Sequence, residues 1–504
     1  MTLHGLTDRY GGHEDARVVE IDVSGTRREM TQSDLHALAA ERAGQLTAAG
    51  VRRGHLIGIK AGNSIDWLAW DLAALATGAL LKAFPDSTEV TDPAEFTARH
   101  RLALLVADDS VPLTAPTVIR PDGVPGENVV PPSAEVYDHA DVHSLVYSSG
   151  TSGRLKGLRI TASGTEYVIN RFIDSYRMTA ADRHLIFLPL SNYQQRLSVY
   201  CCLWLGADLV LAPYQRVFQA LRKEQPTFLI GPPVFYDTAL QLSASSGAGT
   251  GLGDFLGGRI RFLITGMAPI RRETLEGYWK QGVCLLEAYG LTETGMVAWN
   301  TQDAYRLGSV GKLIDPEAVI FLDDGEVVIK RPAPLSQGYF ETEDGAPEDC
   351  FRPDGSILTG DYGRLDEDGY LTLIGRKKDV IVLGSGRKVH PAEIESAFAA
   401  VEGLSEIIVV PTSQSARLGA IITPTDPADA DLRVQLRKRV EEVNGSLPPH
   451  QRVMSMIFSE RPLRSDPAFM TGNLKLSRAR AAEHFAATIS AAPAADPAAD
   501  EGGR

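Results

Sequence analysis

Hydrophobic positions near the start of the chain repeat first with a helical period and then in short, strand-length runs. Residues 31–49 carry leucines at helical spacing behind Thr31, a hydroxyl residue that can cap a helix. Residues 55–60 form an apolar run between turns and predict a strand, and residues 64–78 predict a long second helix. This order of elements is typical of α/β proteins.

Short apolar runs continue between helix-length segments through the first half of the chain. Strands are predicted at residues 102–107, 145–147, 185–188, 209–212, 228–230 and 261–265. The two most apolar stretches, Leu68–Leu81 and Ser198–Ala212, are interrupted by Asp71 and Asp208 and are shorter than the roughly 20 residues of a membrane span. We therefore expect both stretches to be buried helices, and we expect the alternation to build largely parallel layers.

The pattern changes after about Gly308 to short strands between glycine and aspartate turns. Strands are predicted at residues 325–330, 370–374 and 380–383, so a β-rich region follows the α/β layers. A smaller α+β unit then extends to about residue 486. The Ala-, Pro- and Asp-rich residues 487–504 are expected to be disordered.

Composition narrows the class of protein without indicating its chemistry. The 504 residues exceed one hydrophobic core, so two or three domains are expected. The 64 acidic and 50 basic residues give a net charge of −14, which argues against broad nucleic-acid binding. The four cysteines lack metal-ligand spacing and predict buried apolar positions in a reducing compartment. The first residues contain no secretory signal, so we expect a cytoplasmic protein without a membrane span.

The strongest local motif is the glycine-serine segment Tyr147–Gly157, which directly follows an apolar strand. Its glycines allow sharp turns, its hydroxyl and amide groups can point inward, and Lys156 adds a positive charge, a combination that suits a polyphosphate. It is not a Walker A loop, because Leu155 and Gly157 stand where Gly and Ser or Thr are required. A flexible surface loop is the alternative interpretation.

Two further motifs carry carboxylates. In Glu287–Gly295, a glycine flanked by Tyr289 and Leu291 can place a flat ring against the backbone, and Glu293 is a hard oxygen ligand suited to Mg²⁺. A helix start capped by Thr292 explains that segment about as well. Asp361 follows a tight turn after a strand and could bind a ribose diol, although a structural turn aspartate is the default interpretation.

The last two motifs lie in the C-terminal part. Gly375–Glu395 predicts a basic turn, a strand, a glycine turn and then a helix with Pro391 at its first position. Thr471–Arg478 is a polar turn that presents Lys475, which by itself would be a solvated surface charge.

Taken together and in this order, the five motifs closely resemble those of the adenylate-forming superfamily of acyl- and aryl-CoA synthetases, nonribosomal-peptide adenylation domains and luciferases. The resemblance covers roughly residues 30–485. It implies an α/β fold with a large N-terminal domain of layered α/β subdomains plus a distorted β-barrel (residues 1–377) and a small, mobile α+β C-terminal domain (residues 378–486). It also implies an enzyme that uses ATP and Mg²⁺.

The resemblance assigns roles to individual residues. Those implied for the β- and γ-phosphates are Ser148, Ser149, Gly150, Thr151, Ser152, Gly153 and Lys156. Those implied around adenine and the α-phosphate are Gly266, Met267, Ala268, Pro269, Glu287, Ala288, Tyr289, Gly290 and Thr292. Thr151 and Glu293 would hold Mg²⁺, and Asp361, assisted by Arg376, would bind the ribose hydroxyls.

Two lysines have implied roles in the reaction cycle. Lys475 looks like the family's adenylation lysine, which together with Thr151, Glu293 and Lys156 would form the catalytic group. Lys378 occupies the hinge position about which the small domain rotates between adenylation and thioester formation. In the second pose the Gly384–Lys388 loop would replace Lys475 at the active site.

Two departures from the family pattern bear on the substrate. Leu155 replaces a usual proline, which should change little beyond loop stiffness. Many acyl- and aryl-CoA ligases carry a histidine or an aromatic residue where Asn192 stands. The segment that follows is unusually polar, and the substrate residues expected from it and from the adenine region are Asn192, Tyr193, Gln195, Arg196, Gly266 and Gly290. The alternative is that some of these side chains face solvent on a helix.

The acid and the acceptor stay open at this stage. The leading hypothesis is a ligase that joins an aryl or fatty carboxylate to CoA. The alternative is an adenylating enzyme whose acceptor is a carrier-protein thiol or an amine, including a diazo-forming enzyme that adenylates nitrite for transfer to an aryl amine. A degenerate nucleotide-binding regulator is disfavoured because Lys156, Glu293, Asp361, Arg376 and Lys475 are all present. We expect a monomer or homodimer that binds a small acid and no nucleic acid.

Overall fold

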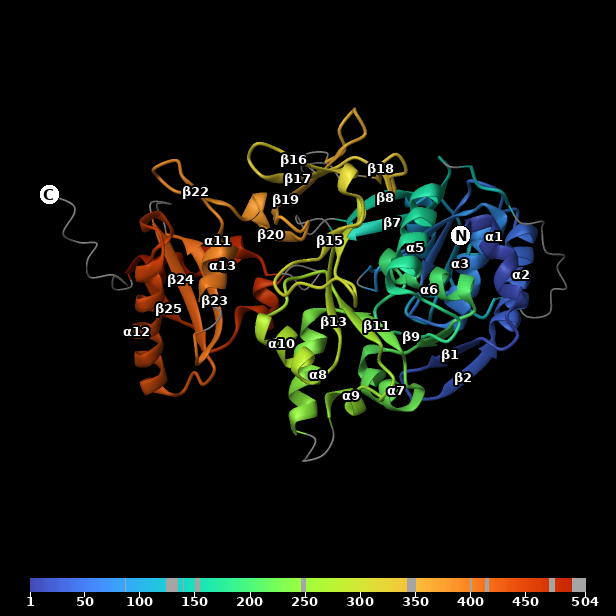
Figure 1. The fold of residues 1–504 in the computed structure, drawn as a ribbon. Coiled ribbons are helices and arrows are strands. Elements are labelled where there is room, and N and C mark those ends of the chain that lie inside the picture. Colours follow the sequence, from blue (N-terminus) through green and yellow to red (C-terminus); the bar gives the residue numbers. More distant parts are fainter. Residues whose placement is uncertain are drawn as a thin grey trace. The chain divides into compact units, whose positions relative to one another are not determined.

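The computed structural model describes residues 1–86, 88–123, 135–138, 140–149, 155–245, 251–341, 350–398, 401–412, 417–470 and 476–491. These residues divide into two compact units, whose elements are labelled in Figure 1. The first unit holds the described residues up to Val319 together with Ile329–Ile357. The second holds Ile320–Val328 and the described residues from Leu358 onward.

The first unit contains a nine-stranded sheet. Its strand order is β15 (Lys312–Leu313), β14 (Gly295–Trp299), β13 (Leu285–Leu291), β12 (Phe262–Thr265), β11 (Phe228–Gly231), β9 (Arg183–Ile186), β10 (Asp208–Leu211), β1 (Arg17–Ile21) and β2 (Arg27–Thr31). The strands from β13 to β1 run parallel, and the strands at both edges run antiparallel.

A seven-stranded sheet lies in the same unit. Its order is β18 (Ser336–Glu341), β8 (Leu155–Thr161), β7 (Val142–Ser149), β4 (Leu80–Ala83), β3 (Leu56–Lys60), β5 (Leu102–Ala107) and β6 (Val118–Ile119). The strands from β7 to β6 are parallel, so this unit has the α/β layers that the sequence pattern predicts.

Helices connect and cover these strands. They are α1 (Leu3–Arg9), α2 (Gln32–Ala48), α3 (Ile65–Thr77), α4 (Pro93–Arg99), α5 (Ala162–Tyr176), α6 (Tyr193–Leu205), α7 (Val217–Glu224), α8 (Pro233–Ser245), α9 (Leu252–Phe255) and α10 (Arg272–Lys280). Thr31 caps α2 through a capping box with Asp34, so the predicted cap at Thr31 is confirmed, and Ser64 caps α3.

Neighbouring residues on a strand enter different hydrophobic cores. Ile264 of β12 and Val106 of β5 belong to one core that also includes side chains of α3, α5 and α6. Leu263 of β12 faces a second core with α7, α8 and α10, whereas Leu105 of β5 faces a third core with α4. Because side chains alternate across a strand, each sheet is covered on both faces.

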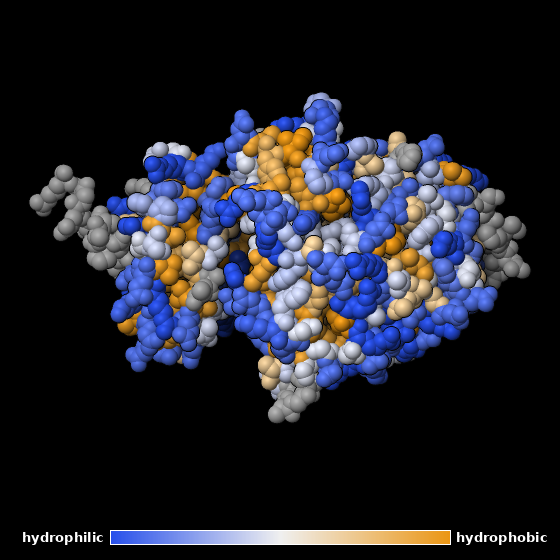
Figure 2. All heavy atoms as spheres, in the orientation of Figure 1, coloured by the Kyte–Doolittle hydropathy of each residue, from blue (hydrophilic) through white to orange (hydrophobic). Residues whose placement is uncertain are grey.

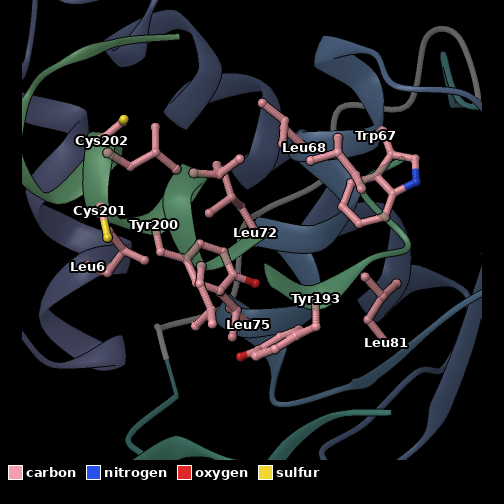
Figure 3. Close-up of a cluster of buried hydrophobic side chains, with 14 of the residues drawn as sticks. Leu6, Trp67, Leu68, Leu72, Leu75, Leu81, Tyr193, Tyr200, Cys201 and Cys202 are labelled. Carbon is pink, nitrogen blue, oxygen red and sulfur yellow. The ribbon is translucent and has the colours of Figure 1, made fainter. Parts of the chain in front are cut away.

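The shared core is dense around α3 and α6 (Figure 3). The labelled side chains are Leu6, Trp67, Leu68, Leu72, Leu75, Leu81, Tyr193, Tyr200, Cys201 and Cys202. Cys201 and Cys202 are buried, as expected of apolar positions, and burial raises the pKa of both thiols. Cys284 and Cys350 are only partly buried, so the expectation was wrong for these two.

The two apolar stretches expected to be buried helices each end in a strand, so that expectation was wrong at their C-terminal ends. The helix predicted over residues 64–78 and the strand predicted over residues 209–212 are confirmed to within one residue at each end. Helix α3 ends before Gly78 and α6 ends before Gly206. Both glycines adopt positive φ (66° and 72°), a conformation that ends a helix, and β4 and β10 begin two residues later.

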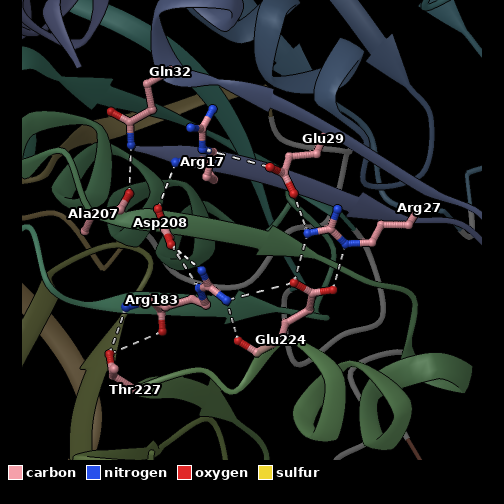
Figure 4. Close-up of polar contacts among 9 residues, drawn as sticks. All are labelled: Arg17, Arg27, Glu29, Gln32, Arg183, Ala207, Asp208, Glu224 and Thr227. Carbon is pink, nitrogen blue, oxygen red and sulfur yellow. Dashed lines mark hydrogen bonds and ion pairs between the residues drawn. The ribbon is translucent and has the colours of Figure 1, made fainter. Parts of the chain in front are cut away.

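Charged contacts connect the β1–β2 hairpin, which forms one edge of the nine-stranded sheet, to β9, β10 and α7 (Figure 4). Arg183 of β9 contacts Asp208 through two guanidinium nitrogens, at 2.9 and 2.6 Å, and Asp208 also accepts the backbone N–H of Arg17. Arg27 of β2 donates to Glu224 at the end of α7 at 2.9 Å. These contacts connect three segments that are distant in sequence.

The second unit contains three sheets. They are β16 (Val319–Phe321), β17 (Glu326–Ile329), β19 (Ile357–Leu365) and β20 (Leu371–Arg376); β21 (Ile381–Val382) and β22 (Lys388–Val389); and β23 (Leu404–Pro411), β24 (Leu418–Pro424) and β25 (Val453–Phe458). Among the described strands no closed sheet is found, and the distorted barrel expected within residues 1–377 stays a prediction. Helices α11 (Pro391–Ala397) and α12 (Ala430–Ser446) share one core with the last sheet, and α13 (Arg478–Ala491) shares another.

Helix α11 begins with Pro391 at its first position, as predicted, and α13 extends to Ala491, beyond the predicted start of the tail. Most of the face shown in Figure 2 is hydrophilic. No helix in the described ranges is both long and apolar enough to cross a membrane.

Candidate active site

The parallel strands β12 and β13 bring two motif segments together at their carboxyl ends. Thr265 and Glu287 are paired in register, so their side chains project from the same face of the sheet. The carboxyl edge of a parallel sheet is the usual position of an α/β ligand site. Within the described part of the chain, Thr265 Oγ1 and Glu287 Oε2 are buried and make no hydrogen bond. Buried polar atoms without a hydrogen bond are rare in folded proteins, so these two atoms make this edge a candidate binding site.

Burial also changes the chemistry of Glu287. Desolvation raises the pKa of its carboxyl group from 4.5 to about 8. The group is therefore mostly protonated at neutral pH and can donate a hydrogen bond. Its backbone carbonyl is already occupied, because it accepts the backbone N–H of Asn300 at 2.9 Å.

The segment Gly266–Pro269 follows β12 directly and makes a tight turn. The Ala268 N–H donates to the Gly266 carbonyl at 2.8 Å, and Met267 between them has φ of +70°. This is the geometry of a γ-turn with positive φ, which is strained for a residue with a side chain. Strain of this kind concentrates at ligand sites, and this turn lies beside the edge that carries Thr265.

The Glu287–Gly295 motif is a hairpin of β13 and β14, so the alternative of a helix start capped by Thr292 was wrong. Ala288 and Tyr289 are buried, and Gly290 pairs with Met296 across the hairpin. A Cβ at Gly290 would lie 2.4 Å from the Gly295 carbonyl oxygen, so the hairpin has no room for a side chain at this position. Thr292 and Glu293 lie in the connection between the two strands.

The glycine-serine motif lies at the ends of β7 and β8. These strands pair antiparallel through Ser148 and Lys156, which places the two ends of the motif side by side. Gly150, Thr151, Ser152 and Gly153 lie outside the described residues, as do the side chains of Ser148, Ser149 and Lys156. Their phosphate roles stay predictions.

The polar segment after Leu188 forms the N-terminus of α6. Asn192 is the N-cap and accepts the Gln194 N–H at 3.2 Å. Gln195 is fully buried, and neither atom of its amide makes a hydrogen bond with any described residue. Gln194, which we did not include among the substrate residues, contacts Met296 of the β13–β14 hairpin at 3.9 Å. A role for this helix end in binding the acid stays a prediction.

Arg196 has internal partners that sequence reasoning missed. Its guanidinium pairs with Asp71 of α3 and donates to Ser144 Oγ at 2.8 Å and to Tyr200 OH at 3.1 Å. Asp71 also accepts from Tyr200 at 2.7 Å, and both side chains of the ion pair are 1% exposed. The signal was visible in the sequence, because a carboxylate inside an apolar helix requires a partner.

Tyr193 is also buried, and its hydroxyl contacts side chains of the core. Its hydroxyl lies 2.6 Å from Thr165 Oγ1 and 2.8 Å from His143 Nε2. Burial lowers the pKa of His143, and nearby Arg196 lowers it further, so the imidazole is neutral. Internal hydrogen bonds therefore account for the polarity of both Tyr193 and Arg196.

The residues predicted to bind ribose belong to the second unit. Asp361 of β19 is opposite Arg376 of β20, and Arg376 Nε lies 2.9 Å from Asp361 Oδ1. Beside this pair, Lys377 contacts buried Glu326 at 2.6 Å. Lys378, the predicted hinge residue, lies in the short turn Lys377–Asp379 that follows β20.

Lys475 lies outside the described residues, but the residues around it are held firmly. Met470 and Leu476 form a bridge, and the Ser477 N–H donates to the Phe469 carbonyl at 2.7 Å. Arg478 then pairs with Glu395 of α11. Both sides of the lysine segment are thereby fixed to the body of the second unit.

Family models match both parts of the chain. The model described as AMP-binding enzyme matches residues 7–340, and the one described as AMP-binding enzyme C-terminal domain matches residues 378–496. The chain therefore belongs to the AMP-binding enzyme family and is an adenylate-forming ligase. This agrees with the motifs and with the layered fold.

Individual relatives are more distant. The chain is 27% identical to "Long-chain-fatty-acid--CoA ligase FadD15" of Mycobacterium bovis over 90% of this chain and 91% of that protein. It is 25% identical to "2-succinylbenzoate--CoA ligase" of Listeria monocytogenes over 76% of this chain and 81% of that protein. ATP-bound MatB from Rhodopseudomonas palustris has the same fold, with a TM-score of 0.79, 22% identity and coverage of 97% of this chain and 100% of that one.

Proposed function

We propose that this chain activates a carboxylic acid with ATP, releasing pyrophosphate, and then transfers the acyl group from the adenylate to the thiol of CoA. The observation that carries the proposal is the edge of β12 and β13. There a strained turn, a hairpin position with no room for a side chain and two buried polar atoms without a hydrogen bond to any described residue adjoin the motifs of the family. Relatives named as CoA ligases support the acceptor.

In this proposal each motif contacts one part of ATP. Tyr289 and the Gly266–Pro269 turn bind adenine, and Asp361 with Arg376 binds the ribose. Ser148–Gly153 and Lys156 bind the β- and γ-phosphates, and Thr292 contacts the α-phosphate. Rotation about Lys378 would then exchange the adenylation and thioester poses, with residues 378–486 as the mobile domain.

The chemistry needs charge neutralisation more than proton transfer. A carboxylic acid is already ionised at pH 7, so its attack on the α-phosphate needs no general base. Two anions must approach, and negative charge grows on the phosphoryl oxygens. Lys475 would bridge the carboxylate and the α-phosphate and would hold the in-line geometry.

The residues present suit a magnesium ion at Glu293. The structure holds one carboxylate oxygen of Glu293 3.3 Å from Tyr339 OH, and the other makes no hydrogen bond with any described residue. An open carboxylate oxygen is the ligand that Mg²⁺ prefers, and Thr151 would add a hydroxyl. The bound ion would neutralise charge on the phosphates and on the leaving pyrophosphate.

An aryl or fatty carboxylate is the proposed acid. The named ligases among the relatives act on a long-chain fatty acid and on 2-succinylbenzoate, and both are carboxylates. The alternative acceptors, a carrier-protein thiol or an amine, and nitrite as the activated acid, are separated from CoA by the assays below.

Pyrophosphate exchange into ATP, measured across a panel of carboxylates and nitrite, tests the first half-reaction. Exchange with at least one carboxylate is expected, and Lys475→Ala should abolish it. Lys438→Ala, an exposed lysine of α12, is the matched control and should leave exchange unchanged. Failure of every acid, or full exchange in Lys475→Ala, would contradict the proposal. AMP release that requires CoA would support the acceptor, and CoA-independent turnover would exclude it.

A further inference from the structure

Tyr339 connects the two sheets of the first unit next to the proposed metal site. It lies in β18, which pairs with β8, the strand that follows the glycine-serine motif. Its hydroxyl is 3.3 Å from Oε1 of Glu293, which belongs to the hairpin at the edge of the other sheet. The two residues are 46 positions apart, so only the fold brings them together.

The contact has a defined donor. The phenol O–H of Tyr339 donates to Oε1 of Glu293. At 3.3 Å the bond is longer than most O–H···O hydrogen bonds. The bond occupies Oε1 and leaves Oε2 without a hydrogen bond to any described residue.

Two neighbours restrict the direction of the Tyr339 side chain. The ring contacts Phe351 edge to face, with centroids 5.2 Å apart and an interplanar angle of 86°. Cys350 Sγ lies 3.4 Å from the hydroxyl oxygen. Either atom of the Cys350 contact can be the donor, whereas the phenol donates in the contact with Glu293.

We propose that Tyr339 is a positioning residue that orients the Glu293 carboxylate, and that it thereby sets the affinity of the enzyme for Mg²⁺ together with ATP. The inference rests on the proposed function, in which Glu293 is the metal ligand. Hydrogen-bond partners of metal ligands commonly contribute about 10- to 100-fold to metal affinity or activity. Tyr339 is expected to act through Glu293 alone and to leave binding of the acid unchanged.

The test is Tyr339→Phe, which removes the hydroxyl and keeps the ring against Phe351. Binding of Mn²⁺, as a paramagnetic substitute for Mg²⁺, is measured by electron paramagnetic resonance with a non-hydrolysable ATP analogue. The Mg²⁺ dependence of pyrophosphate exchange is measured in parallel. We expect about 10-fold weaker metal binding and an equally raised Mg²⁺ requirement, with the KM of the acid unchanged. Tyr214→Phe, at an exposed tyrosine, should change neither.

The double variant with Glu293→Gln decides between positioning and a general structural effect. If Tyr339 acts through Glu293, adding Tyr339→Phe to Glu293→Gln causes no further loss of metal affinity. Equal metal affinity in wild type and Tyr339→Phe, or a loss that persists in the Glu293→Gln background, would overturn the inference. Wild type without pyrophosphate exchange would instead contradict the proposed function, and the Mn²⁺ titration would still report on Tyr339.

Discussion

Replacing Arg196 separates an internal ion pair from a substrate contact. In Arg196→Met the Asp71 carboxylate, 1% exposed, loses the guanidinium and retains Tyr200 OH at 2.7 Å. Removing one partner of a buried ion pair typically costs about 3–5 kcal/mol, because the other charge stays buried and uncompensated. Ser144 Oγ also loses its donor at 2.8 Å, so we expect a loss near the upper end of that range.

Urea unfolding followed by tryptophan fluorescence measures this loss in the full chain. All five tryptophans lie in the first unit, so the signal reports the unit that contains the pair. The control is the double variant Asp71→Leu/Arg196→Met, which removes both charges. Replacing a buried ion pair by apolar residues is often neutral or stabilising, so most of the lost stability should return.

The KM of the double variant for the carboxylic acid distinguishes a role of Arg196 in the core from a role in binding substrate. If Arg196 serves the core alone, the double variant is stable and its KM for the acid is near that of wild type. A stable double variant that no longer binds the acid would show that Arg196 contacts substrate. A loss below about 1 kcal/mol in Arg196→Met, or no recovery in the double variant, would refute the buried-pair reasoning.

Three further substitutions test the site. Glu287 has a pKa of about 8 when folded and 4.5 when unfolded, so it retains a proton in the native state, and the free energy of unfolding should fall by up to roughly 4 kcal/mol from about pH 5 to pH 8. Glu287→Gln should flatten that pH dependence, and a wild-type free energy of unfolding that does not change over this range would contradict the raised pKa. Gly290→Ala places a Cβ 2.4 Å from a backbone oxygen, so it should lower the free energy of unfolding by about 1–3 kcal/mol and abolish ATP binding, measured by calorimetry. Gly62→Ala, where the added Cβ meets open space, should change neither quantity. Gln195→Met removes a buried amide that makes no hydrogen bond with any described residue, so it should raise the free energy of unfolding, measured in urea, by about 1–3 kcal/mol. A lower free energy of unfolding would instead mean that the amide is hydrogen-bonded in solution.

Local chemistry was predictable from the sequence because it depends on neighbours along the chain. The cap of α2 at Thr31 and the proline that begins α11 were visible as residue types at fixed offsets. The strand–helix alternation predicted the parallel layers for the same reason. The order of five motifs indicated the adenylate-forming family, which the family models then confirmed.

The ends of apolar stretches were less predictable. The stretches Leu68–Leu81 and Ser198–Ala212 each contain helical residues, a glycine and residues of a buried strand, which their hydrophobicity alone does not separate. A continuous apolar run fits a buried helix and a buried parallel strand equally well, so periodicity cannot distinguish them. The glycine is the more reliable signal at such a boundary.

Only the tertiary structure decided which polar side chains serve the core and which remain available to a ligand. Arg196 and Tyr193 stand beside Gln195 on one helix, yet the first two are paired internally and the amide of the third makes no hydrogen bond to a described residue. The partners Asp71 and His143 come from elements far along the chain, and such contacts depend on how helices pack on sheets. A sequence pattern records which side chains a helix carries, whereas burial and pairing depend on what the fold places opposite them.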